Sequence, residues 1–137
     1  LPLAIAPFGP DGALELVGVR TPHLGGVVEF YRLVGNDLQI VAEVPGYTAH
    51  VIGTRNLDMA VAGDFDADGL PELLIPTQDR RTLGGIQRTA DGAAVIYRLD
   101  VGGEVITNLS AVAPLEGELI VGVGRADGVL RLWGDNS

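Results

Sequence analysis

The chain has 137 residues, of which 47% are apolar, and carries a formal net charge of -9 at pH 7 with no cysteine. This length suits one domain, and the apolar content excludes an intrinsically disordered chain. An acidic surface repels phosphates, so we expect no nucleic-acid partner. Without cysteine there are no disulfides, thiolate metal sites or cysteine nucleophiles. No apolar stretch approaches the roughly 20 residues of a membrane helix, so we expect no membrane insertion.

Short apolar runs rich in Val, Ile and Leu follow one another along the whole chain. In chain order we expect strands at residues 3–6, 14–19, 27–33, 38–44, 59–62, 72–75, 93–99, 104–107, 118–123 and 129–133. Gly, Pro or Asp-Gly pairs separate most of these runs, which is typical of hairpins rather than of βαβ units. The continuously apolar run 118–123 predicts a strand buried on both faces. The pattern predicts an all-β fold without an internal domain boundary.

The sequence repeats itself along the chain. Residues 6–16 align with residues 63–73, matching a Phe, an Asp-Gly pair and a Glu-Leu pair. The Tyr-Arg-Leu triplet at 31–33 returns at 97–99, with the larger offset that loop insertions produce. A further Asp-Gly pair, Asp127-Gly128, follows Asp68-Gly69 at nearly the interval that separates Asp11-Gly12 from Asp68-Gly69. Each period holds four strands, so one structural unit is repeated.

Four antiparallel strands per period are typical of a β-propeller blade, and propellers usually close with 4 to 8 blades. We expect one propeller-like domain over residues 1–137. Repeat 1 covers about 1–57, repeat 2 about 58–116 and a partial repeat 3 about 117–137. Because two and a half blades do not close, the chain would be a fragment, one of several chains that complete a ring, or a small sandwich. A second register aligns 126–128 with 90–92 and makes the last two strands the middle pair of a blade, and the sequence leaves both registers open.

The acidic loop at residues 63–72, GDFDADGLPE, has the residue types of a calcium site. Asp64, Asp66 and Asp68 alternate along the chain, so their carboxylates converge if the loop curls around one point. Gly69 permits the sharp turn that a side chain would obstruct. Ca²⁺ takes 6 to 8 oxygen ligands at about 2.3 to 2.6 Å, whereas Mg²⁺ prefers to keep its waters. An ordinary solvated turn is the alternative, because Asp-Gly is itself a hairpin signal.

The ligand spacing differs from that of an EF-hand. An EF-hand needs an acidic residue at the twelfth loop position, and counting from Asp64 that position is Ile75. Glu72 at the ninth position is instead expected to close the ligand shell, with the Leu70 carbonyl as a backbone ligand. The metal-site residues are therefore Asp64, Asp66, Asp68, Leu70 and Glu72.

Residues 63–73 resemble the calcium-binding loop of FG-GAP repeats, also called VCBS-type repeats, whose pattern is D-x-D-x-D-G-x-x-D. Glu72 stands where that family usually has Asp. The resemblance implies a β-propeller blade with a structural Ca²⁺ on the hairpin between its first two strands. It also implies an extracellular, cell-surface or periplasmic location, where calcium can fill a weak site. Pro7 and Gly9 replace the first two aspartates in repeat 1, so we expect that repeat to have lost its ion.

The blade topology of that family would bring several polar loop residues to the face opposite the calcium hairpin. The candidate ligand-binding residues are His23, Tyr47, His50, Arg55, Arg80 and Arg81, with Asn56 beside them. They could bind a sugar acid, a peptide carboxylate or a partner, although ordinary polar loops are the simpler explanation.

The expected function is a calcium-stabilised binding or scaffold module for a protein or a carbohydrate. The sequence contains no G-x-S-x-G, phosphate-binding loop or HExxH motif, and no catalytic residue is proposed. The alternative is part of a polysaccharide-active enzyme of the lyase type, in which calcium neutralises a uronate carboxylate.

Overall fold

The computed structural model describes residues 2–20, 25–49, 59–112 and 120–134. Within these residues the secondary structure consists of strands and turns, and no helix there is long and apolar enough to cross a membrane. The strands are β1 (Pro2–Ala6), β2 (Glu15–Arg20), β3 (Val27–Val34), β4 (Asp37–Pro45), β5 (Val61–Gly63), β6 (Glu72–Pro76), β7 (Thr82–Thr89), β8 (Gly92–Asp100), β9 (Ser110–Val112), β10 (Ile120–Gly124) and β11 (Leu130–Gly134).

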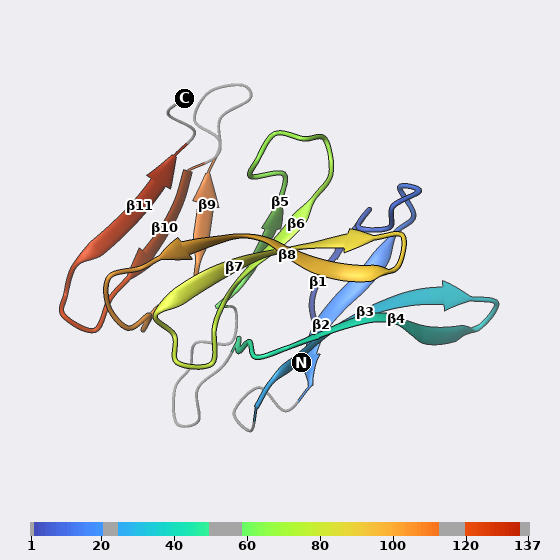
Figure 1. The fold of residues 1–137 in the computed structure, drawn as a ribbon, viewed down its shortest axis with the longest axis horizontal. Helices are drawn as coiled ribbons and strands as arrows, with labels where there is room; N and C mark the ends of the chain where they lie inside the picture. Colours follow the sequence, from blue (N-terminus) through green and yellow to red (C-terminus); the bar gives the residue numbers. More distant parts are fainter. Residues whose placement is uncertain (1, 21–24, 50–58, 113–119, 135–137) are drawn as a thin grey trace.

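Three antiparallel sheets follow one another along the chain (Figure 1). The first sheet contains β1 to β4 and the second contains β5 to β8, each in sequence order. The third has three strands in the order β11-β10-β9. The predicted all-β fold with antiparallel four-stranded units is therefore confirmed. None of the described sheets closes on itself.

The first two sheets repeat each other in detail. Ala6 pairs with Glu15 in the first sheet as Gly63 pairs with Glu72 in the second, so strand pairing follows the alignment of residues 6–16 with residues 63–73. Both sheets also carry an irregularity at the same place between their third and fourth strands. The two Tyr-Arg-Leu triplets are not equivalent, because 31–33 lies in β3 and 97–99 lies in β8.

The third sheet begins earlier than residue 117. β9 pairs with β10, so the strand Ser110–Val112 belongs to the third sheet rather than to the second. Asp127-Gly128 lies in the turn between β10 and β11, the second and third strands of this sheet, and is not equivalent to Asp68-Gly69. Among the described residues β11 is an edge strand, so the middle position of the last two strands in a blade stays a prediction. By its bridge, the β10–β11 turn corresponds to the β6–β7 turn and not to residues 90–92.

The same backbone connection joins each sheet to the next. Beyond β4, Tyr47 forms a bridge with Thr77 in the β6–β7 turn, and beyond β8, Val105 forms a bridge with Arg125 in the β10–β11 turn. The flanking hydrogen bonds are Thr48 N to Pro76 O at 3.0 Å and Gln78 N to Gly46 O at 3.0 Å, repeated as Ile106 N to Gly124 O at 3.0 Å and Ala126 N to Glu104 O at 2.8 Å. The structural repeat therefore includes the connection between sheets.

Two apolar cores separate the three sheets. Leu73 and Ile75 of β6 pack into the core shared with the first sheet, and Leu74 between them packs into the core shared with the third. This strand is buried on both faces, which explains its continuous apolar sequence. In β10, by contrast, Val121 and Val123 are buried while the alternate residues Ile120, Gly122 and Gly124 are only partly covered. The expectation of burial on both faces is thus wrong for β10.

Candidate metal centre

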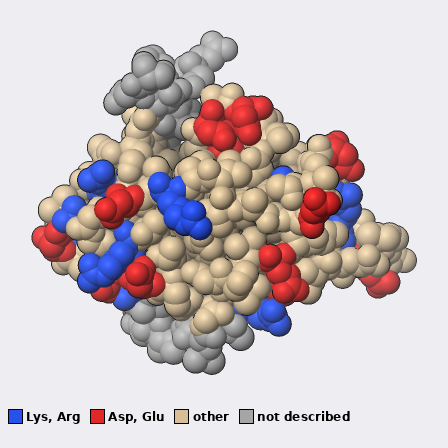
Figure 2. Space-filling view, viewed as in Figure 1, with Lys and Arg blue, Asp and Glu red and all other residues tan. Residues whose placement is uncertain are grey.

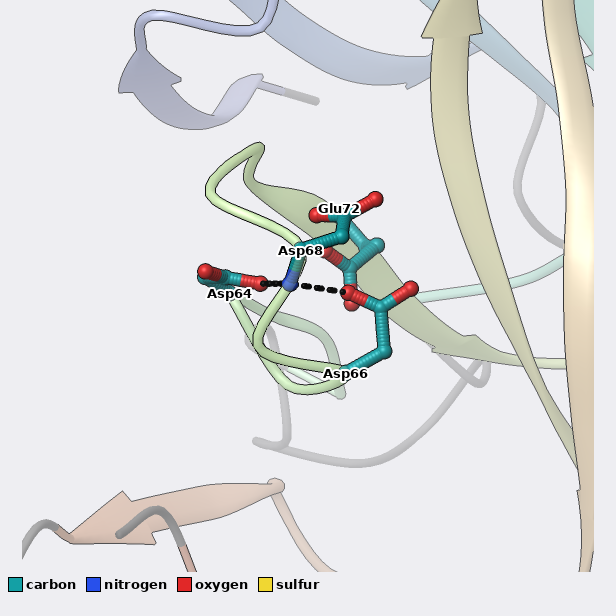
Figure 3. A group of neighbouring side chains, drawn as sticks. All are labelled: Asp64, Asp66, Asp68 and Glu72. Atoms are coloured by element: carbon teal, nitrogen blue, oxygen red, sulfur yellow. Dashed lines mark hydrogen bonds between the residues drawn. The ribbon is translucent and has the colours of Figure 1, made fainter. Parts of the chain in front are cut away.

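The acidic loop connects β5 to β6 and gathers four carboxylates. Asp64, Asp66, Asp68 and Glu72 each offer one oxygen, and these four atoms all lie within 4.8 Å of one another (Figure 3). Figure 2 shows acidic atoms clustered at the top of the molecule, where Figure 1 draws this loop. The structure therefore brings together the four predicted side-chain ligands.

Hydrogen bonds from the loop's own backbone hold the aspartates in place. Asp64 accepts from the amides of Asp68, at 3.1 Å, and Gly69, at 2.8 Å. Asp66 also accepts from the Asp68 amide, at 3.2 Å. Gly69 has the predicted left-handed conformation, with φ of 89°, and Ala67 shares it with φ of 61°. A non-glycine residue in this region costs roughly 1–2 kcal/mol, so the curled loop is held against local strain.

Glu72 is the buried member of the cluster. Its Oε1 accepts hydrogen bonds from the Phe65 amide at 3.1 Å and from the Tyr97 hydroxyl at 3.2 Å. Its Oε2 is buried and has no hydrogen-bond partner among the described residues. Burial, together with the nearby Asp66 charge, raises the pKa of Glu72 to about 7. A buried carboxylate is stable only with a partner of opposite charge or with a proton, so this side chain requires one or the other.

The neighbouring aspartates have pKa values shifted in opposite directions. Burial raises the pKa of Asp66, whereas the hydrogen bond from the Leu70 amide, at 2.9 Å, lowers that of Asp68. The Gln87 amide group also donates to Asp68 Oδ2 at 3.1 Å. Asp68 is therefore held in its charged form at the open side of the cluster. The Leu70 carbonyl as a backbone ligand stays a prediction.

The predicted ligand-binding face lies only partly within the described residues. His23, His50 and Arg55, with Asn56, lie outside the described residues. Tyr47 is buried rather than exposed, because its ring packs on Gly84, where an added Cβ would lie 2.6 Å from Tyr47 Cε1.

Two arginines of that predicted face lie in the β6–β7 turn. Arg80 forms an ion pair with Glu104 and donates to the Val105 carbonyl at 3.2 Å, so it fastens the connection that leads to the third sheet. Arg81 is exposed, and its backbone amide donates to Asp79 at 3.0 Å. The Arg80 side chain is therefore engaged in contacts within the chain, whereas the Arg81 side chain is exposed to solvent.

Comparison of the chain with protein-family models, curated proteins and solved structures found no match. The resemblance to FG-GAP repeats therefore depends on the residues of the loop 63–73 and on the internal repeat. What the chain does must be inferred from the geometry of the acidic cluster and from the repeated sheets.

The raised pKa of Glu72 predicts how stability depends on pH in chelator-treated protein. The folded chain keeps a proton on this carboxyl up to about pH 7, whereas the unfolded chain releases it near its ordinary pKa of 4.5. Folding therefore becomes less favourable as the pH rises between these values, by up to about 3 kcal/mol. Urea unfolding at about pH 5, 6 and 8 measures the decline, and Glu72→Gln should remove it. A decline of equal size in this variant would assign it to other groups.

Proposed function

We propose that the loop of residues 64–72 binds one Ca²⁺ and that the chain is a calcium-stabilised repeat segment acting as a binding or scaffold module for a protein or a carbohydrate. The buried Glu72 supports this most directly, because its unpartnered Oε2 lies within a cluster of three further carboxylates. None of the ion pairs formed by the described residues involves these four groups. A bound cation would supply the missing positive charge.

The ligand types favour Ca²⁺ over Mg²⁺. Four carboxylates from one short loop offer up to eight oxygens, which suits the high and flexible coordination number of Ca²⁺. Because the ion would join the loop to the first residue of β6, its role is structural. An ion that binds only the folded loop adds about 2.7 kcal/mol when it is a hundredfold above its Kd.

The three sheets are proposed to be blades of a β-propeller of the FG-GAP type. The repeated connection between sheets supports this, since it orients each sheet on the next in the same way. Further residues of the same protein, or other chains, would complete the ring. A calcium site of modest affinity favours an extracellular, cell-surface or periplasmic location.

Calcium titration of thermal stability tests the metal assignment. Added Ca²⁺ should raise the melting temperature of the native chain by roughly 10 °C over chelator-treated protein. Asp66→Ala should abolish this response, because it removes a ligand from the centre of the loop. Asp91→Ala, which truncates an exposed aspartate in the β7–β8 turn, should respond as the native chain does. Identical melting curves with and without Ca²⁺ in the native chain would exclude the site.

A further inference from the structure

The β1–β2 hairpin of the first sheet is the structural counterpart of the metal loop. Because Ala6 and Glu15 occupy the places of Gly63 and Glu72, the loop residues between them also correspond one to one. Asp11 therefore stands at the position of the third loop aspartate. Pro7 and Gly9 stand at the positions of the first two.

The third strands of the two sheets supply the next equivalence. Tyr31 pairs with Leu16 as Ile86 pairs with Leu73, so Tyr31 and Ile86 occupy the same place in their sheets. Arg32 in β3 is then the counterpart of Gln87 in β7. A guanidinium in the first sheet thus replaces an amide in the second.

Arg32 contacts both carboxylates that remain in the first hairpin. Its Nη2 lies 3.2 Å from Asp11 Oδ1 and 2.8 Å from Glu15 Oε2, and its Nε donates to Glu15 Oε2 at 3.1 Å. The Glu15 side chain is fully buried, whereas that of Asp11 is exposed. Positive charge therefore lies between the counterparts of Asp68 and Glu72.

The glycine at position 9 leaves the space that this guanidinium occupies. A Cβ added at Gly9 would lie 2.5 Å from Arg32 Nη2 and 2.8 Å from Asp11 Oδ1. An aspartate there, as at position 66, would require the Arg32 guanidinium and the Asp11 carboxylate to shift from these positions. The loss of two loop aspartates and the presence of Arg32 are thus parts of one arrangement.

The two equivalent buried glutamates, Glu15 and Glu72, differ in whether they have a cationic partner. Glu15 accepts from Arg32 and also from Arg88, whose Nε lies 2.8 Å from its Oε1, so both of its oxygens face cations. Glu72, at the same place in the second sheet, has an unpartnered Oε2.

We infer that Arg32 is the built-in cation of the first hairpin and supplies there the positive charge that the second hairpin takes from a divalent metal ion. The second half of this statement rests on the proposed function. The β1–β2 hairpin is then a converted metal site, closed by a side chain and independent of calcium, and the β5–β6 hairpin is the calcium-dependent one.

Transfer of the arrangement into the second hairpin tests the inference. Asp66→Gly opens the space and Gln87→Arg supplies the guanidinium, and the single variant Asp66→Gly is the reference. In chelator, we expect the double variant to melt above the single variant and above the native chain, because the introduced guanidinium would pair with Asp68 and Glu72. Added Ca²⁺ should not raise its melting temperature. A double variant that melts at the same temperature as the single variant in chelator, or whose melting temperature rises on addition of Ca²⁺, overturns the inference.

Removal of the Arg32 guanidinium is a second test of the inference. Arg32→Gln should lower the melting temperature by the same amount in calcium and in chelator. Arg81→Gln, which changes an exposed arginine in the β6–β7 turn, is the matched control and should alter it little. If Arg32→Gln is as mild as this control, the inference fails. A native chain that ignores Ca²⁺ would refute the proposed metal site alone, because the comparisons in chelator do not depend on that response.

Discussion

Glu15→Gln is expected to lower the free energy of unfolding by about 3–5 kcal/mol, because it leaves buried positive charge without a partner. Arg88 of the second sheet donates to both Glu15 oxygens, at 2.8 and 3.3 Å, and its side chain is only 7% exposed. A neutral amide keeps one of the two acceptor oxygens and carries no charge, so it cannot replace the contacts that the carboxylate makes through both oxygens. Since Glu15 and Arg88 belong to different sheets, the loss should also weaken the packing between them. Urea unfolding followed by circular dichroism measures the change.

Glu43→Gln is the matched control for this experiment. The Glu43 carboxylate is about half exposed and lies 3.7 Å from the exposed Arg20, so its removal should cost less than about 1 kcal/mol. Salt should alter the Glu15 effect only slightly, because a buried ion pair is poorly screened. Equal effects of the two substitutions would show that the Glu15 pair is solvated in solution.

Features that depend only on residues close together in the chain could be predicted from the sequence. Alternating aspartates followed by Gly69 define a curled loop whose side-chain ligands all lie within residues 64–72, so local geometry brings them together. Most strands followed similarly from apolar runs and turn residues, but β7 and β9 were not predicted, and the strand expected at 104–107 is only an isolated bridge at Val105. The alignment of residues 6–16 with 63–73 related the first two hairpins. For the third sheet this reasoning failed, because Asp-Gly occurs in many turns and Asp127-Gly128 lies in a different one.

Contacts between distant residues could not be predicted in this way. Arg88 reaches Glu15 across 73 positions, and Tyr97 reaches Glu72 from β8 across 25. Tyr47 was expected on the ligand-binding face because the blade topology implied by the FG-GAP resemblance places its loop there. It is buried because the connection between sheets places its ring on Gly84, and the sequence contains no local sign of that contact.

The equivalence of Arg32 and Gln87 can be read from the sequence only after the strand pairing is known. Once strand pairing matches Tyr31 with Ile86, Arg32 aligns with Gln87, and the gain of a cation coincides with the loss of two loop aspartates. The offset in the third strands differs from that of the hairpins because the turn between the second and third strands differs in length. An alignment of the sequence with one fixed repeat period therefore does not match Arg32 with Gln87.

Glu72→Gln is expected to change the stability in a direction that depends on calcium. In chelator at about pH 8 the variant should be more stable than the native chain by about 2–3 kcal/mol. The reason is that the Glu72 carboxyl, whose pKa is raised to about 7, is charged and buried at this pH, whereas the amide is neutral. The amide oxygen can still accept from Phe65 and Tyr97, and its NH₂ can donate to the aspartates. With saturating Ca²⁺ this advantage should disappear, since the native chain gains binding energy and the variant does not.

Paired urea unfolding curves in calcium and in chelator, for the native chain and for Glu72→Gln, measure this interaction between substitution and metal. Glu43→Gln, with the same change of chemistry on an exposed side chain, should leave the calcium response intact. If Glu72→Gln keeps the full calcium response, Glu72 is not a ligand. If it is less stable than the native chain in chelator, the buried carboxylate is already neutralised by another group. A metal ion coordinated by Glu72 predicts both results: Glu72→Gln is more stable than the native chain in chelator, and this difference disappears in calcium.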